Sequence, residues 1–136
     1  MSYLVLIVDD DLTTQALLQE TVKSQGHTPI VCSDGKIAVE MLLSLEFQLV
    51  ILDINLPGVN GWDIFNYIQK NIPRTCVLIT TGTKDDKTEL FEAEQSEHYK
   101  LCYKPLGKSF IQEVNSLVKK ALTKRKALNN ISPDLQ

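Results

Sequence analysis

The chain has 136 residues, of which 43% are hydrophobic and 23% charged, and its formal net charge is −3 at pH 7. This length and composition fit one globular domain with one proper core and exclude a chain that is disordered throughout. The negative charge argues against a domain whose main task is to coat nucleic acid. The first apolar run stops abruptly at Asp9, Asp10 and Asp11, so we expect no secretory leader or membrane span and place the protein in the cytoplasm.

Short apolar runs recur along the chain and are expected to form strands. Most of them are continuous rather than alternating, which is typical of parallel strands buried on both faces. The cysteines Cys32, Cys76 and Cys102 each fall in such a run and are interpreted as small buried hydrophobic side chains. The five predicted strands cover residues 3–8, 28–32, 49–52, 76–80 and 101–103.

Between these runs the apolar residues follow helical spacing. The first helix is marked by Leu17 to Val22, and the others fall near residues 37–45, 62–72, 90–93 and 110–122. The fourth of these segments holds few apolar residues, so we expect its helix to be the least firmly packed.

The alternating order predicts an α/β fold, (βα)5, in which helices cover both faces of a doubly wound, five-stranded parallel sheet. The domain is expected to span residues 1–123, and residues 124–136 to form a polar C-terminal tail or linker. Lysines near the end of the last helix, such as Lys119 and Lys120, are interpreted as a solvated helix end rather than a DNA contact.

Polar side chains stand at the carboxyl ends of four predicted strands, where open α/β sheets place functional groups. These residues are Asp9 and Asp10, Asp53, Thr81 and Lys104. Taken singly, each has a plainer reading, because acids after strands also cap helices and a lysine before proline also forms ordinary turns. Their shared position predicts that three carboxylates, a hydroxyl and an ammonium group meet at one rim of the sheet.

Three neighbouring carboxylates repel one another unless a cation offsets their charge. Mg²⁺, or Mn²⁺ in its place, prefers oxygen ligands and keeps several waters, so coordination positions remain for phosphoryl oxygens. In such a site one carboxylate acts as the nucleophile, while the ion and Lys104 offset the charge of a transferring phosphoryl group. The sequence therefore indicates phosphoryl-transfer chemistry.

Four motifs, taken together and in order, resemble the signature of response-regulator receiver domains (the CheY-like superfamily) of two-component signalling. The resemblance covers residues 3–122 and implies the flavodoxin-like strand order 2-1-3-4-5. The motifs are Leu6-Ile7-Val8-Asp9-Asp10, Leu52-Asp53-Ile54-Asn55-Leu56-Pro57-Gly58, Thr80-Thr81-Gly82 and Lys104-Pro105.

The resemblance also implies a role for each matching residue. Asp53 corresponds to the phosphoacceptor, and Asp9 and Asp10 to the acidic pair that holds Mg²⁺. Asn55 corresponds to the position whose backbone carbonyl completes the metal site, and Lys104 to the lysine that contacts the phosphoryl oxygens.

By the same resemblance, Thr81 is the switch hydroxyl that moves toward the phosphoryl group, and Gly82 is the small residue that leaves room for it. Leu101 departs from the pattern, because the family often has tyrosine or phenylalanine at this switch position. Tyr99 and Tyr103 flank Leu101, and we expect them to point to the opposite face of the sheet. How the threonine is coupled to the output surface is thus left open.

The function implied is that of a phosphoacceptor rather than an enzyme: a histidine kinase or phosphotransfer protein phosphorylates Asp53, and self-dephosphorylation follows. The resulting switch controls a downstream effector or output domain. Dimerisation through the last two helices is left open.

Two alternative functions are retained. One is a phosphorylation-independent interaction module with the same fold. The other is a haloacid dehalogenase-like phosphatase, because Asp53 and Asn55 resemble the Asp-x-Asp opening of those enzymes, with Asn55 in place of the second acid.

Overall fold

The computed structural model describes residues 2–94, 96, 98–104, 111–112, 114–120 and 122–123. The polar tail expected at residues 124–136 lies outside the described residues, as does the boundary predicted before it. In the part of the chain that is described, no helix has the length and apolar character needed to cross a membrane.

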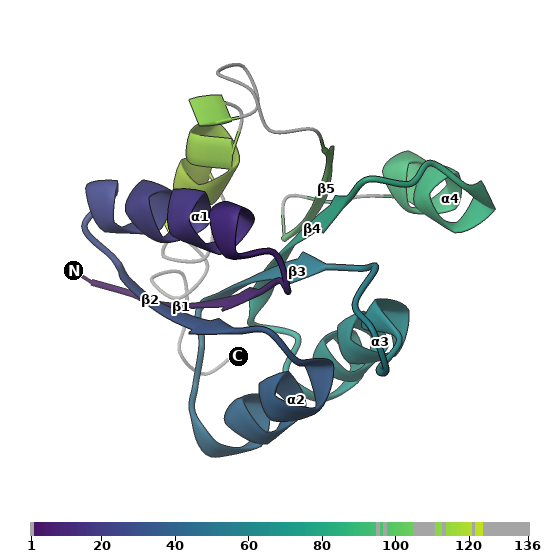
Figure 1. The fold of residues 1–136 in the computed structure, drawn as a ribbon, viewed down its shortest axis with the longest axis horizontal. Coiled ribbons are helices and arrows are strands. Elements are labelled where there is room, and N and C mark those ends of the chain that lie inside the picture. Colours follow the sequence, from purple (N-terminus) through teal and green to yellow (C-terminus); the bar gives the residue numbers. More distant parts are fainter. Residues whose placement is uncertain are drawn as a thin grey trace.

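Five strands form one sheet in which every neighbouring pair is parallel (Figure 1). Their order is β2-β1-β3-β4-β5, which confirms the α/β class and the flavodoxin-like topology. The order reverses direction at β1, so the ends of β1 and β3 lie side by side at the switch point where such folds place their sites. The strands are β1 (Leu4–Val8), β2 (Thr28–Cys32), β3 (Leu49–Asp53), β4 (Cys76–Thr81) and β5 (Tyr99–Tyr103).

Helices follow the first four strands, and the described residues between 111 and 123 are helical as well. Each of the four named helices is preceded by a polar side chain that accepts a hydrogen bond from a backbone N–H of the first turn, namely Asp11, Asp34, Asn60 and Asp85. Asp11, which follows the acidic pair Asp9 and Asp10, thus caps α1. The helices are α1 (Leu12–Ser24), α2 (Gly35–Ser44), α3 (Gly61–Asn71) and α4 (Asp86–Glu94).

The sheet separates two hydrophobic cores, and alternation along β1 shows how. Val5 and Ile7 pack on the side covered by α1 and the last helix, whereas Leu6 and Val8 pack on the side of α2 and α3 (Figure 1). The central strands β1, β3 and β4 are buried along almost their whole length, as expected for a sheet covered on both faces.

The last strand is longer than predicted and corrects one expectation. Tyr99, Leu101 and Tyr103 all pack in the core on the α3 side, while Cys102 packs in the other core. The prediction that the two tyrosines point away from Leu101 was wrong, because residues two apart on a strand share a face.

The start of α3 is packed tightly against the chain that leaves β3. A Cβ atom on Gly61 would lie 2.6 Å from the Ile54 Cα, so a glycine is needed at this position.

Helix α4 is packed more loosely. Thr88 is its one buried residue, which confirms that α4 is the least firmly packed of the four named helices.

Candidate functional site

Three carboxylates meet where β1 and β3 end. Oxygen atoms of Asp9, Asp10 and Asp53 all lie within 4.8 Å of one another. Val8 pairs with Leu52 in the parallel register, so Asp9 and Asp53 leave adjacent strands at the same level. Asp9 and Asp53 are 1% and 5% exposed, and Asp10 is exposed, so the cluster opens to solvent on one side.

The two buried carboxylates are held in the same way. One oxygen of Asp9 accepts the backbone N–H of Asp11 at 2.9 Å, and one oxygen of Asp53 accepts that of Asn55 at 2.9 Å. Such bonds to an N–H two residues on are typical of aspartates at turns. The second oxygen of each carboxylate therefore remains available to other groups at the site.

Lys104 bridges those second oxygens. Its ammonium Nζ lies 2.9 Å from Asp9 Oδ2 and 3.2 Å from Asp53 Oδ2. The backbone N–H of Lys104 donates to the Thr81 carbonyl oxygen at 2.7 Å, which ties the end of β5 to the end of β4. The lysine predicted to join the acids thus does so from the far strand of the sheet.

Burial and neighbouring charges shift the pKa values of Asp9 and Lys104. Burial is the largest effect on Asp9 and raises its pKa, although the Asp11 N–H and Lys104 work in the opposite direction. Burial by itself would lower the pKa of Lys104, but the bond to Asp9 and the charges of Asp53 and Asp9 raise it above the ordinary value. The ammonium group therefore stays charged at neutral pH.

The charge balance of the cluster favours a further cation. One ammonium group faces three carboxylates, so two negative charges remain uncompensated when all four groups are ionised. All the side-chain donors are oxygen atoms, the ligand type that Mg²⁺ prefers. The residues present fit a hard divalent ion.

Thr81 is fully buried at the end of β4 and is joined to the cluster through Asn55. Its hydroxyl lies 2.6 Å from Asn55 Oδ1, to which it donates, and it accepts the backbone N–H of Thr83 at 3.0 Å. Asn55 also donates from Nδ2 to Thr83 Oγ1 at 3.4 Å. The Asn55 side chain therefore holds Thr81, a contact that the sequence did not predict.

Gly82 and Leu101 are the remaining predicted site residues, and neither belongs to the cluster of carboxylates. Gly82 is exposed, and no described atom lies within 4 Å of the place where a Cβ would stand, so the space beside it is open. Leu101 is 9% exposed, pairs with Ile79 of β4 and packs in the core on the α3 side. It lies beneath the carboxyl rim and not among the carboxylates.

Gln15 is a supporting residue that the sequence analysis missed. Its Nε2 donates to the backbone carbonyl of Asp9 at 2.5 Å and to Ser33 Oγ at 2.9 Å. Gln15 is buried on the same face of α1 as Leu18 and Val22. A polar side chain on an apolar helical stripe was the signal that could have identified it.

A fold of this class, with an acidic cluster at its switch point, has a close counterpart among known proteins. The family model described as the response regulator receiver domain matches residues 5–115. The chain belongs to this family of two-component signalling domains, which confirms the resemblance seen in the sequence.

Individual relatives and a solved structure agree with this assignment. The chain is 36% identical to the uncharacterized transcriptional regulatory protein YrkP of Bacillus subtilis (strain 168) over 91 residues, and this alignment covers 65% of the chain. It is 27% identical over 128 residues, 93% of the chain, to the transcriptional regulatory protein HprR of Escherichia coli (strain K12). It spans 38% and 54% of those two sequences.

The fold is similar to that of a CheY-like response regulator receiver domain protein from Methanospirillum hungatei JF-1, with a TM-score of 0.79 and 19% identity. This likeness covers 93% of the present chain and 98% of that protein.

Proposed function

We propose that this domain accepts a phosphoryl group on Asp53 from a histidine kinase or a phosphotransfer protein, and that the modification switches a downstream effector or output domain. One observation carries the proposal. The Asp53 carboxylate lies at the switch point of the sheet, beside Asp9 and Asp10, with the Lys104 ammonium 3.2 Å away.

In the transfer step, a carboxylate oxygen of Asp53 forms a bond to phosphorus as the phosphorus–nitrogen bond of the donor's phosphohistidine breaks. The electron pair of that bond stays on the imidazole nitrogen, which takes up a proton. Lys104 is placed to offset negative charge on the phosphoryl oxygens through a charge-assisted hydrogen bond. Mg²⁺ held by Asp9, Asp10, Asp53 and the Asn55 carbonyl would supply further charge compensation.

The switch follows from competition for the Thr81 hydroxyl. In the structure this hydroxyl bonds to Asn55, and a phosphoryl group on Asp53 would offer it a more strongly charged acceptor. Reversing a population from 1:99 to 99:1 requires contacts that differ between the two states by about 5.5 kcal/mol. Hydrogen bonds to a charged group contribute roughly 1.5–3 kcal/mol each, so the two from Thr81 and Lys104 supply about 3–6 kcal/mol, which reaches this difference at the upper end of the range.

The relatives suggest how an output could be connected to this receiver domain. The chain spans 38% of YrkP and 54% of HprR, which are both named transcriptional regulatory proteins. An output domain that follows the receiver domain in a longer protein would fit these proportions. A separate effector protein is the other arrangement, and both would respond to the same modification of Asp53.

The test is labelling by acetyl phosphate in the presence of Mg²⁺, followed by intact-protein mass spectrometry. Wild type is expected to gain one phosphoryl group that is labile to hydroxylamine, and Asp53→Asn none. Asp63→Asn is the matched control, because Asp63 is an exposed aspartate on α3 outside the cluster. It should be labelled as wild type is.

Labelling of Asp53→Asn at the wild-type rate would refute the assignment. No labelling of wild type by acetyl phosphate or by any phosphorylated donor tested would favour the phosphorylation-independent interaction module. Continuous turnover of a phosphomonoester such as p-nitrophenyl phosphate would instead favour the phosphatase.

A further inference from the structure

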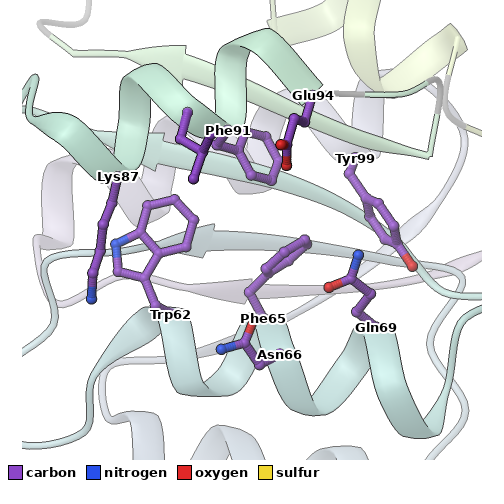
Figure 2. Close-up of a pocket in the computed structure, with 9 residues that line it drawn as sticks. Trp62, Phe65, Asn66, Gln69, Lys87, Phe91, Glu94 and Tyr99 are labelled. Carbon is purple, nitrogen blue, oxygen red and sulfur yellow. The ribbon is translucent and has the colours of Figure 1, made fainter.

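A groove lies between α3 and α4 (Figure 2), and none of its lining residues belongs to the acidic cluster. Its volume is about 310 Å³, and side chains of both helices and of Tyr99 on β5 line it. None of the residues that bind Lys104 or Thr81 belongs to it. The phosphoryl-transfer chemistry proposed for the domain therefore leaves the groove without a role.

The two helices present matching stripes to the groove. The lining residues of α3 run from Trp62 to Gln69, and those of α4 run from Lys87 to Glu94. In both helices they stand at positions i, i+3, i+4 and i+7, so one face of each helix borders the groove for two turns. The result is an elongated trough parallel to two helices, with the proportions of a site for a third helix.

The walls of the trough carry aromatic rings in contact with one another. Phe65 lies in edge-to-face contact with Phe91 and Tyr99, with ring centroids 5.3 and 5.1 Å apart. Trp62 lies 5.8 Å from Phe91 and completes the set. At the outer edge, Leu90 is 60% exposed although it lines the same hollow. The structure thus leaves an apolar surface open to solvent.

Charges mark the two ends of the trough. Figure 2 shows Lys87 beside Trp62 at one end, and Glu94 near Gln69 and Tyr99 at the other. Glu94 is the last residue of α4, a helix that has no basic residue in its last turn. The negative end of the helix dipole and the Glu94 carboxylate therefore act together, and this end favours a cationic group.

We propose that the groove binds an amphipathic helix of a partner protein, with bulky apolar side chains in the aromatic trough and an arginine or lysine against the Glu94 end. The volume lies at the lower limit of small-molecule sites, roughly 300–1,000 Å³, and suits one or two side chains rather than a cofactor. The charge at Glu94 selects a basic partner segment, and the parallel stripes select a helical one.

The experiment uses the full chain and a synthetic helical peptide. The probe carries leucine and phenylalanine at i, i+3, i+4 and i+7, arginine at the end that faces Glu94 and uncharged polar residues elsewhere, and a control peptide has alanine at the apolar positions. Trp62 is the single tryptophan of the chain and lines the groove, so its emission reports binding there. The probe is expected to shift this emission saturably, and the alanine peptide to leave it unchanged.

Leu90→Ala is expected to weaken probe binding by at least about tenfold, because the apolar contact of this side chain with the probe is lost. The matched control is Leu43→Ala, since Leu43 on α2 is 68% exposed, lies outside the groove, and loses the same side chain. Glu94→Lys should also weaken binding of the arginine peptide and strengthen binding of its glutamate counterpart.

Equal probe affinity for wild type and Leu90→Ala would overturn the proposal. So would an emission shift caused equally by the alanine peptide, because charge alone would then explain binding. Saturable binding of free indole-3-propionate without any peptide binding would identify a small-molecule site instead. The peptide experiment is carried out on the unphosphorylated protein, so its outcome is separate from that of the Asp53→Asn labelling test.

Discussion

At the scale of single residues, Thr80 and Thr81 form a natural pair for comparison. Both are buried at the end of β4, at 1% and 0% exposure. The Thr81 hydroxyl bonds to Asn55 and Thr83, whereas that of Thr80 has no hydrogen-bond partner among the described residues. Burying a hydroxyl is favourable only where its hydrogen bonds are made, so the two threonines differ in their contribution to stability.

We predict that Thr81→Val lowers the free energy of unfolding by about 1–3 kcal/mol, because it leaves the Thr83 N–H and the Asn55 oxygen without their partner. Thr80→Val should be neutral or stabilising, since it replaces an unpaired hydroxyl with a methyl group. Urea denaturation of both variants measures the difference. Equal losses in the two variants would contradict this account of the Thr81 contacts.

His27 gives a prediction about pH. Its ring stacks on Tyr3, its Nδ1 accepts the Tyr3 backbone N–H at 3.0 Å, and burial lowers its pKa below the ordinary value of 6.5. The unfolded chain therefore takes up a proton at a higher pH than the folded chain does. The contribution of His27 to stability is present above about pH 6.5 and is lost as the pH falls below it.

The measurement is urea denaturation of wild type and His27→Asn between pH 7.5 and 5.5. Asparagine can accept the same Tyr3 N–H without titrating, so the variant should lose less stability than wild type on acidification. His98, the second histidine, is present in both proteins, so any contribution of its own cancels in the comparison. Parallel curves for the two proteins would rule out His27 as a source of the pH dependence.

At the scale of elements, α4 stands apart from the other named helices. A reciprocal pair of bonds between Asp85 and Thr88 holds its first turn, with Asp85 accepting the Thr88 N–H at 2.9 Å and Thr88 Oγ1 accepting the Asp85 N–H at 2.8 Å. Beyond Thr88 no residue of the helix is fully buried, and its last turn has no basic side chain. The helix is therefore anchored at its start and weakly held at its end.

We predict that backbone amides in the second half of α4 exchange with deuterium at least about tenfold faster than those of α3, because few buried contacts oppose local opening. Helix α3 is the internal control, since it buries Ile64, Phe65 and Ile68 against the sheet. Hydrogen exchange followed by NMR measures both helices in one sample. Equal protection of α3 and α4 would show that the exposed side chains of α4 do not reflect its stability.

The elements also show what the sequence could and could not predict. Continuous apolar runs located the strands because a covered parallel sheet needs apolar residues on both faces, but the start of β5 was missed because Tyr99 and Lys100 are only partly buried. The rule that sites form at strand ends located Asp53 and Lys104. The Gln15 and Asn55 contacts depend on how separate elements pack, and one-dimensional spacing does not contain that information.

At the scale of the whole molecule, the acidic cluster links ion binding to folding. Asp9, Asp53 and Lys104 reach the cluster from the ends of β1, β3 and β5, so the cluster exists only when the sheet is formed. An ion that binds the folded state alone stabilises it by mass action. The uncompensated charge of the cluster makes a divalent cation the expected ligand.

We predict that Mg²⁺ raises the thermal midpoint Tm of wild type, with a stabilisation of about 2.7 kcal/mol when its concentration is 100 times the dissociation constant. Asp10→Asn should reduce this increase strongly, since it removes an exposed ligand and leaves the buried pair of Asp9 and Lys104 intact. Asp63→Asn should respond as wild type does, and NaCl of equal ionic strength should not reproduce the increase. An equal Mg²⁺ response in Asp10→Asn would mean that the ion acts elsewhere, and the three carboxylates would then need another role.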